Sequence, residues 1–248
     1  MQGRGMSIAA VICAAGSSKR MGGRKKEYLR LNPDAPGEKP VTVLGAAAAA
    51  FASCSEINPI VIVLPDEAPA GILEELRAID PARFLFAKGG QTRRASVFNA
   101  LLLLEKHAPS HVLIHDGARP RITKSLIEKV IGAMLKHGAA IPALPMTETP
   151  KELKNPLVSA APPEAAADNF VRRHLKRDTL CVAQTPQGFK FPEILMAHEK
   201  AAAREEKESI EYTDDAEIWG EFVGEVAVIP GDPENKKITY QEDIANNK

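Results

Sequence analysis

The chain has 248 residues, of which 44% are hydrophobic and 26% are charged. Its 32 Lys and Arg residues balance its 32 Asp and Glu residues, so the net charge is zero. This balance argues against a general nucleic-acid or membrane-surface binder, because such proteins usually carry an excess of positive charge. The length is sufficient for a substantial core in one large domain or two small ones.

The three cysteines are Cys13, Cys54 and Cys181, which are far apart and form no CxxC pair. They predict small buried side chains in a reducing cytoplasm rather than a disulfide framework or a zinc site. The apolar run near the N-terminus resembles a signal peptide, but it is short and charge follows it at once, so we interpret it as a first strand. No run approaches the roughly 20 apolar residues of a membrane helix. We therefore expect a cytoplasmic protein.

Short apolar runs alternate with helix-like segments along the first 145 residues. The predicted strands are 8–15, 59–65, 83–88, 111–116 and 138–145, and the predicted helices are 41–54, 66–79, 93–107 and 123–137. Nearly continuous apolar runs fit strands that are covered on both faces, which favours a mostly parallel sheet. The repeated alternation predicts a doubly wound α/β domain, in which ligands bind at the carboxyl ends of the strands.

The segment after the first predicted strand reads AAGSSKRMGGRKK and combines small residues with a run of basic ones. On this stretch alone a solvated loop is the simpler interpretation. The alternative is a polyphosphate site, with backbone N–H groups for the oxygens and with Arg20 and Lys26 for the charge. The segment matches neither GxGxxG nor GxxxxGK[ST], so the sequence argues against the usual dinucleotide and P-loop sites.

Two further predicted strands end in glycines or charged residues. The third is followed by Gly89, Gly90 and Gln91, and the fourth by the segment 116–119, Asp-Gly-Ala-Arg. Because the carboxyl ends of parallel strands lie at one edge of a sheet, one crevice could collect all three segments. Asp116 is suited to bind Mg²⁺ beside nucleotide phosphates, and it is equally suited to pair with Arg119.

From about residue 146 to residue 190 the alternation stops, and the sequence becomes rich in Pro, Ala and charge. This composition fits a surface excursion or a partly disordered insertion. The alternative is an arm that carries substrate contacts or pairs with another subunit. A predicted helix at 191–207 and a predicted strand at 224–231 follow. We expect a single domain over 1–248, with the excursion 146–190 inside it.

Six motifs together resemble the 2-C-methyl-D-erythritol 4-phosphate cytidylyltransferases, a family of the non-mevalonate isoprenoid pathway. They are AAGSSKRMG, GGQTRRASVFNAL, VLIHDGARP, AQTPQGF, YTDDA and NKKIT, in the order and spacing of that family from about residue 7 to residue 244. The first motif occurs in many nucleotidyltransferases, whereas the combination with HDGARP, TPQ and TDDA is far more specific. The resemblance implies a Rossmann-like nucleotidyltransferase fold with a protruding dimerisation arm, and a homodimer.

The resemblance also implies roles for individual residues. Arg20 and Lys26 would stabilise the pentacoordinate α-phosphorus, and Asp116 would bind Mg²⁺. The implied CTP-binding residues are Ala14, Ala15, Gly16, Ser17, Ser18, Gly90, Gln91, Ser96, Gly117 and Arg119. The implied contacts of the methylerythritol phosphate are Thr149, Arg177, Thr213 and Lys237, of which Lys237 also reaches the α-phosphate. Since the arm of this family projects into a partner subunit, Arg177 is expected to serve the neighbouring site.

The chain departs from the family pattern at several positions. The first loop has Gly-Ser-Ser where the family often has a second glycine, and Lys25 replaces the usual proline. Gln91 occupies a position that is often acidic, Ala95 stands where an aspartate is common, and Glu148 replaces an aspartate. These departures bear more on the nucleobase contacts than on the residues of the chemical step.

The function that the resemblance implies is the joining of CTP to 2-C-methyl-D-erythritol 4-phosphate, with release of pyrophosphate. One alternative is a cytidylyltransferase for another polyol phosphate, such as ribitol 5-phosphate. A second alternative is a nucleotide-binding module without catalysis. The presence of Arg20, Lys26, Asp116 and Lys237 together argues against that module, because binding alone would not require all four.

Overall fold

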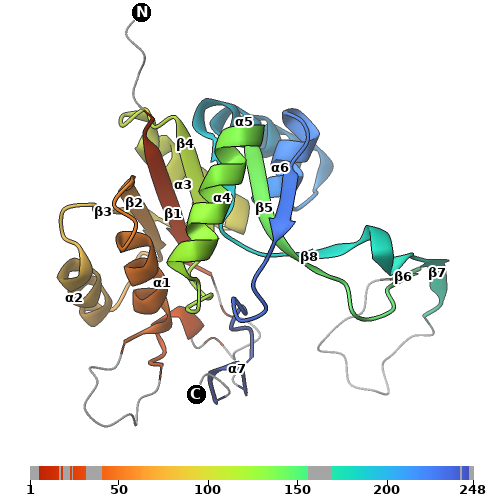
Figure 1. Ribbon diagram of the computed structural model, residues 1–248, viewed down its shortest axis with the longest axis horizontal. Helices are drawn as coiled ribbons and strands as arrows, with labels where there is room; N and C mark the ends of the chain where they lie inside the picture. The colour runs from red at the N-terminus through yellow and green to blue at the C-terminus, as the bar shows by residue number, and fades with distance from the viewer. Residues whose placement is uncertain are drawn as a thin grey trace, which may run out of the picture.

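The computed structural model describes residues 6–16, 18, 23, 25–31, 41–155, 169–240 and 242–245. Its main sheet has the strand order β10-β5-β9-β4-β1-β2-β3, and β8 pairs with β5 beside this path (Figure 1). The strands are β1 (Ile8–Cys13), β2 (Ile57–Leu64), β3 (Phe84–Lys88), β4 (His111–Asp116), β5 (Ala139–Pro145), β8 (Cys181–Ala183), β9 (Gln187–Lys190) and β10 (Ala227–Pro230). Strand β1 is parallel to both of its neighbours, β2 and β4, and the sheet is mostly parallel, as the sequence predicts.

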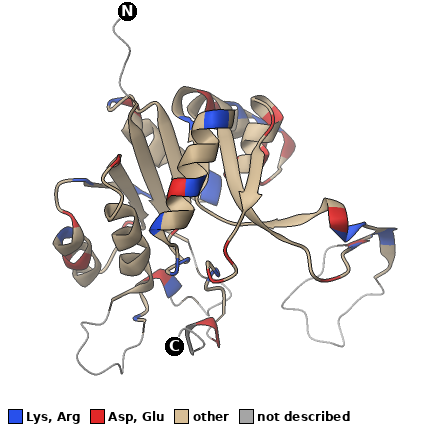
Figure 2. Ribbon diagram, in the orientation of Figure 1, with Lys and Arg blue, Asp and Glu red and all other residues tan. Residues whose placement is uncertain are grey.

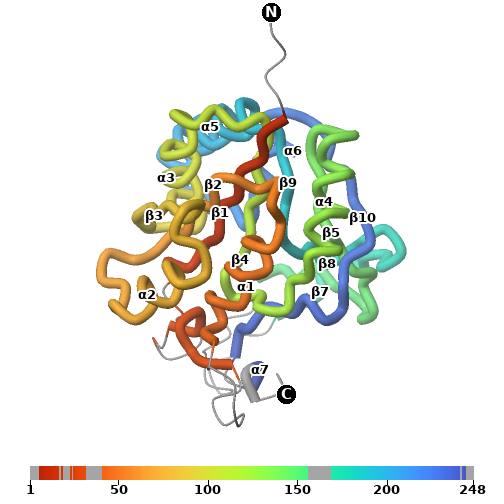
Figure 3. Tube along the Cα trace, turned by 60° about the vertical axis from the view of Figure 1, so that its left-hand side comes forward, coloured from red at the N-terminus to blue at the C-terminus, as the bar shows by residue number. Residues whose placement is uncertain are grey.

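Helices cover both faces of this sheet (Figures 1 and 3). They are α1 (Val43–Ala52), α2 (Ala70–Ile79), α3 (Arg93–Glu105), α4 (Lys124–His137), α5 (Phe191–Glu208) and α6 (Asp215–Phe222). The short α7 (Glu242–Ala245) lies apart from the sheet, near the C-terminus (Figure 1). Successive side chains of a strand point to opposite faces. In β1, Ile8, Ala10 and Ile12 pack with α1, α2 and α4, whereas Ala9 and Val11 pack with α3, α5 and α6. Both faces of β1 are buried, which explains its continuous apolar sequence.

Three helices begin at a threonine that satisfies a free backbone N–H group of the first turn. The side chains of Thr42, Thr92 and Thr123 accept hydrogen bonds from the third residue of α1, α3 and α4, respectively. Thr123 is the first residue of the helix that the sequence predicts over 123–137. Helix α4 ends at Gly138, whose φ of 87° favours glycine.

The segment after β5 leaves the body of the molecule. Strands β6 (Lys151–Leu153) and β7 (Val171–His174) form a separate antiparallel pair that projects to one side (Figure 1). Basic and acidic residues lie close together on this arm (Figure 2), where Arg172 and Arg173 both form ion pairs with Glu152.

The end of the predicted excursion differs from the expectation. Residues 187–190 form β9, which is inserted antiparallel between β4 and β5, so they belong to the main sheet. The same holds for β8, which pairs with β5. The sequence hides β8 and β9 because they are three and four residues long, and because β9 begins at Gln187, which is polar although it is buried. Among the described residues, no helix is long and apolar enough to cross a membrane.

Candidate active site

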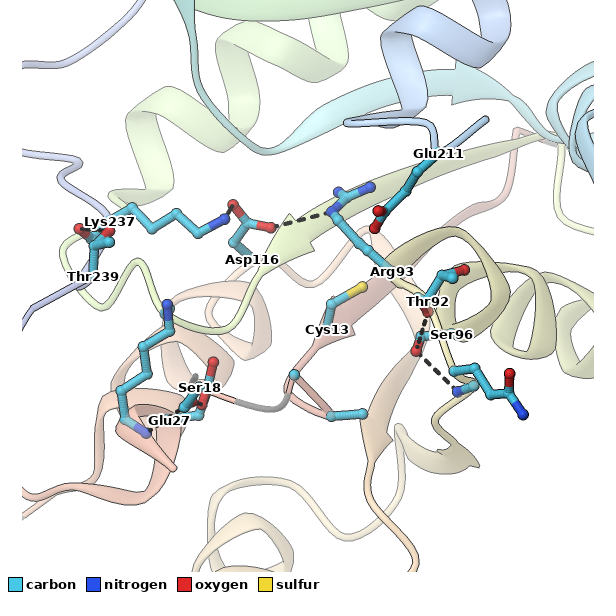
Figure 4. A pocket seen from close by; sticks show the side chains of 16 residues that line it. Cys13, Ser18, Glu27, Thr92, Arg93, Ser96, Asp116, Glu211, Lys237 and Thr239 are labelled. Carbon is cyan, nitrogen blue, oxygen red and sulfur yellow. Dashed lines mark hydrogen bonds and ion pairs between the residues drawn. The ribbon is translucent and has the colours of Figure 1, made fainter. Parts of the chain in front are cut away.

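A cavity of about 490 Å³ lies at the carboxyl ends of β1, β3 and β4 (Figure 4). This is the edge of the sheet at which the predicted topology places a ligand. The residues that line it are Cys13, Ala15, Gly16, Ser18, Lys26, Glu27, Gly90, Gln91, Thr92, Arg93, Ser96, Asp116, Ala118, Glu211, Lys237 and Thr239.

Close backbone contacts hold the three strand ends together. Cys13 of β1 lies opposite Asp116 of β4, and the N–H of Gly117 donates to the carbonyl of Cys13 at 2.9 Å. A Cβ on Gly117 would lie only 3.0 Å from that carbonyl oxygen, and one on Gly89 would lie 2.4 Å from the Cβ of Ala15. Glycine is therefore required where the loops converge.

Asp116 is the centre of a cluster of cations. Its carboxylate lies 2.9 Å from Nζ of Lys237, 3.5 Å from Nε of Arg119 and 3.6 Å from Nε of Arg93. Burial alone would raise the pKa of this carboxyl, but the three cations outweigh burial and hold the pKa well below its usual value. Asp116 is consequently an anion throughout the physiological pH range.

Arg93 contacts a second carboxylate behind the cavity. Its Nη2 lies 2.8 Å from Oδ2 of Asp215, which is fully buried, and Nε2 of His198 lies 3.2 Å from Oδ1 of Asp215. Burial opposes the ionisation of Asp215, but Arg93 and His198 lower its pKa below the usual value. Neither Arg93 nor Asp215 was predicted as a site residue, although both lie within recognised motifs, GGQTRRAS and TDDA.

The loop after β10 brings Lys237 to the cavity. The N–H of Ile238 donates to the carbonyl of Ala118 at 2.8 Å, and Arg119 donates to the carbonyl of Asn235, which is 116 positions away in sequence, at 2.7 Å. The buried amide of Asn235 donates to the carbonyl of Thr185 at 2.8 Å. Three motifs that are distant in sequence, HDGARP, TPQ and NKKIT, are thus in contact.

Thr185 also anchors the end of β4. Its Oγ1 accepts a hydrogen bond from the N–H of Asp116 at 3.1 Å and lies 3.0 Å from Nδ1 of His115. Burial lowers the pKa of His115 to about 4, so this ring is neutral near pH 7. His115 is a structural neighbour of Asp116 and does not line the cavity.

The first loop contributes Ser18, Lys26 and Glu27 to the cavity wall. Oγ of Ser18 donates to Glu27 at 3.3 Å, and burial raises the pKa of the Glu27 carboxyl. Nζ of Lys25 is directed elsewhere, because it donates to the carbonyl of Gly16 at 2.6 Å and lies 3.4 Å from that of Ala15. Arg20 and Ser17, both predicted site residues, lie outside the described residues.

The loop after β3 is closed by hydrogen bonds between its own residues. The N–H of Gly90 donates to Oγ of Ser96 at 2.9 Å, and that hydroxyl donates to the carbonyl of Thr92 at 2.9 Å. A Cβ on Gly90 would lie 2.5 Å from the Cβ of Ala95, so this turn has no room for a side chain. Gln91 lies beside it on the cavity wall.

The structure gathers most of the predicted residues around the cavity. Those that line it are Ala15, Gly16, Ser18, Lys26, Gly90, Gln91, Ser96, Asp116 and Lys237; Arg119 contacts Asp116, and Ala14 and Gly117 lie at the strand ends. Ala14, Gly117 and Arg119 do not themselves line it, and neither do three residues farther along the chain, Thr149, Arg177 and Thr213. Arg177 donates to the carbonyl of Thr147 on the arm, and Thr213 donates to Glu217. The lining residues that sequence reasoning missed are Cys13, Glu27, Thr92, Arg93, Ala118, Glu211 and Thr239.

Known proteins resemble the chain over almost its whole length. The bifunctional enzyme IspD/IspF of Bradyrhizobium sp. (strain ORS 278) is 39% identical over 246 residues, which cover 95% of this chain and 54% of the relative. The bifunctional enzyme IspD/IspF of Bartonella henselae is 35% identical over 242 residues, which cover 96% of this chain and 55% of the relative. The chain thus spans about half the length of these curated relatives.

Solved structures resemble the fold closely. The crystal structure of 4-diphosphocytidyl-2C-methyl-D-erythritol synthase from Anaerococcus prevotii is 28% identical, with a TM-score of 0.78 and coverage of 98% of this chain and 95% of that one. The 2-C-methyl-D-erythritol 4-phosphate cytidylyltransferase of Thermus thermophilus is 29% identical, with a TM-score of 0.69 and coverage of 98% and 97%. Residues 8–248 also match the family model described as "IspD: 2-C-methyl-D-erythritol 4-phosphate cytidylyltransferase". With this match over nearly all of its length, the chain belongs to the 2-C-methyl-D-erythritol 4-phosphate cytidylyltransferase family.

Proposed function

We propose that this chain joins CTP to 2-C-methyl-D-erythritol 4-phosphate, giving 4-diphosphocytidyl-2-C-methyl-D-erythritol and pyrophosphate. The observation that supports this most directly is the anion Asp116, surrounded by Lys237, Arg119 and Arg93 at a cavity that Lys26 also lines. The cations gathered around Asp116 suit the phosphates of a triphosphate, and they suit charge that develops on a phosphorus atom in the transition state.

The proposed reaction is a direct in-line transfer, in which the acceptor phosphate attacks the α-phosphorus as pyrophosphate leaves. The acceptor phosphate is already ionised near pH 7, so it needs no general base. The one sulfur on the described cavity wall belongs to Cys13, and burial raises the pKa of its thiol to about 12. This thiol therefore stays protonated and is a poor nucleophile, which favours transfer without an enzyme-bound intermediate.

We also propose that Asp116 holds Mg²⁺ when the nucleotide is bound. The described residues contain no group of three His, Cys, Asp or Glu side chains that could hold a metal ion. A single carboxylate nevertheless fits Mg²⁺, which is commonly bound by one or two carboxylates together with substrate phosphates and water. The ion would neutralise phosphate charge, and Lys237 would have to share or leave the carboxylate oxygen that it contacts at 2.9 Å.

A homodimer is the proposed assembly, with Arg177 of each arm serving the partner's site. The Arg177 side chain is 56% exposed and does not line the cavity of its own chain. The arm and the adjoining β8 carry exposed apolar side chains, Phe170, Val171 and Val182, which a second subunit could cover. We propose a cytoplasmic location because all three cysteines are free.

The test is pyrophosphate release with a panel of nucleotides and alcohol phosphates. The proposal expects release with CTP and 2-C-methyl-D-erythritol 4-phosphate well above that with other nucleotides or with ribitol 5-phosphate. Faster release with ribitol 5-phosphate would favour the alternative polyol cytidylyltransferase. CTP binding with no pyrophosphate from any acceptor would instead identify a nucleotide-binding module.

A further inference from the structure

Asp215 is buried behind the active-site cavity and contacts the cavity wall through Arg93. It is the first residue of α6, and none of its surface is exposed. Helix α6 does not need it as a cap, because the side chain of Asp214 accepts the hydrogen bond from the N–H of Glu217. We therefore expect this buried charge to act through its contact with Arg93.

The distances show which carboxylate holds Arg93. The guanidinium is 2.8 Å from Asp215 and 3.6 Å from Asp116. Charge attraction grows as the separation and the local dielectric constant fall, and Asp215 is both closer and more deeply buried. Asp215 is thus the stronger partner, and it draws Arg93 away from Asp116.

A third element fixes Asp215 in place. His198 of α5 lies 3.2 Å from Oδ1 of Asp215 and stacks on Phe98 of α3, with ring planes 6° apart. Phe98 is on the same helix as Arg93. The position of Asp215 is consequently tied to the helix that carries its partner.

We propose that Asp215 is a positioning residue that holds Arg93 off Asp116 and so leaves a carboxylate oxygen of Asp116 available to a divalent cation. The inference rests on the proposed function, because the cation is taken to bind together with CTP. Without the Asp215 charge, Arg93 would keep its ion pair with Asp116 and lose the one that opposes it. The guanidinium would then close on Asp116 and compete with the incoming cation.

The test is calorimetry of CTP binding to the full chain, with excess Mg²⁺ and with a chelator, and without any acceptor phosphate. In the wild type, Mg²⁺ should tighten CTP binding. The gain from Mg²⁺ is the ratio of the CTP affinity with Mg²⁺ to that with the chelator. In Asp215→Asn this ratio should fall by about tenfold, since loss of a residue that supports a metal ligand commonly costs 10–100-fold in metal affinity. Binding with the chelator should not weaken, because the cavity becomes more positive. Asp214→Asn, the matched control, should keep the wild-type gain.

The double variant Arg93→Gln/Asp215→Asn separates positioning from a merely structural role. It replaces the ion pair with two amides and removes the competing guanidinium, so it should recover the wild-type gain from Mg²⁺ even if overall CTP affinity falls. Circular dichroism checks the fold of each variant. If Asp215→Asn does not fold, the gain from Mg²⁺ in the double variant is compared directly with that in the wild type.

Three outcomes would overturn the inference. Equal weakening of CTP binding with and without Mg²⁺ in Asp215→Asn would indicate a structural role. A folded double variant that lacks the gain would show that Arg93 is not the competitor. A wild type that binds CTP with no gain from Mg²⁺ would overturn both the metal proposal and this inference. Absence of product with every acceptor, together with the expected calorimetry, would count against the proposed reaction and support the role of Asp215.

Discussion

At the scale of single residues, the two neighbouring lysines of the first loop offer a direct test of which one acts in the reaction. Lys26 lines the cavity, whereas Nζ of Lys25 bonds to the carbonyl of Gly16. Loss of one preorganised charge commonly costs on the order of 10²–10³ in rate, so Lys26→Ala should lower kcat by about that factor. Lys25→Ala should have a milder effect. Steady-state pyrophosphate release measures both, and a larger loss in Lys25→Ala would contradict the assignment.

His115 should make the stability of the protein depend on pH. Its pKa is about 4 in the folded protein and 6.5 as the ordinary value, so between these pH values the unfolded chain binds more protons. Stability therefore rises with pH in this window, and lowering the pH from 6.5 to 4 should remove on the order of 3 kcal/mol. Urea unfolding at several pH values without divalent cations measures the slope. His115→Gln should flatten it, and an unchanged slope in that variant would contradict the prediction.

At the scale of elements, two glycines at different positions should respond to alanine in opposite ways. Gly90 closes the turn between β3 and α3, and a Cβ there would lie 2.5 Å from the Cβ of Ala95 and 2.9 Å from its carbonyl carbon. Gly90→Ala should therefore destabilise the fold by about 1–3 kcal/mol, since crowding of this kind must move the start of α3. It should also weaken CTP binding, because Ser96 and Gln91 share this turn.

Gly132 is the matched control, because it lies in the middle of α4 and a Cβ there would meet nothing within 4 Å. Gly132→Ala should stabilise the protein by about 0.5–1 kcal/mol, since alanine loses less backbone freedom than glycine when a helix forms. Thermal and urea unfolding of the two variants measure the difference. A destabilised Gly132→Ala or an unaffected Gly90→Ala would show that the packing around these two glycines is not as described.

At the scale of the whole molecule, the proposed dimer predicts complementation between two inactive variants. Arg177→Ala and Asp116→Asn should each be inactive if Arg177 of one subunit serves the site that contains Asp116 of the other. In a mixed dimer one site keeps both residues and the other lacks both. After statistical exchange, half of the dimers are mixed and each has one intact site of two, so about a quarter of the normal rate should return.

The exchange itself needs a control, because an unmixed sample would also show no recovery. Each variant should carry a different affinity tag. Protein that is retained in two successive purification steps, one for each tag, consists of mixed dimers. Asp116 is buried among three cations, so circular dichroism must show that Asp116→Asn is folded. A monomer in solution, or proven exchange without recovered activity, would show that Arg177 does not serve a partner.

The doubly wound sheet and more than half of the residues on the cavity wall could be predicted from the sequence. Runs such as residues 8–13 are apolar at both odd and even positions, which fits a strand that is buried on both faces. Parallel strands then bring the Gly- and charge-bearing segments after β1, β3 and β4 to one edge, because their carboxyl ends coincide there. The N-cap at Thr123 was equally readable, since capping is decided within four residues of sequence.

Other features depend on contacts between segments that are distant in sequence, and no local pattern predicts them. Strand β9 has only four residues, of which the first and last are polar, and its burial comes from β4 and β5 on either side rather than from a pattern of its own. The pairing of Arg93 with Asp215 joins two helices that are distant in sequence, and the residues next to either one do not predict the other as its partner. Lys237 reaches Asp116 because Asn235 and Ile238 are bonded to residues of other segments. Periodicity reports which face of an element is buried, whereas the contacts between charged side chains depend on how distant elements meet.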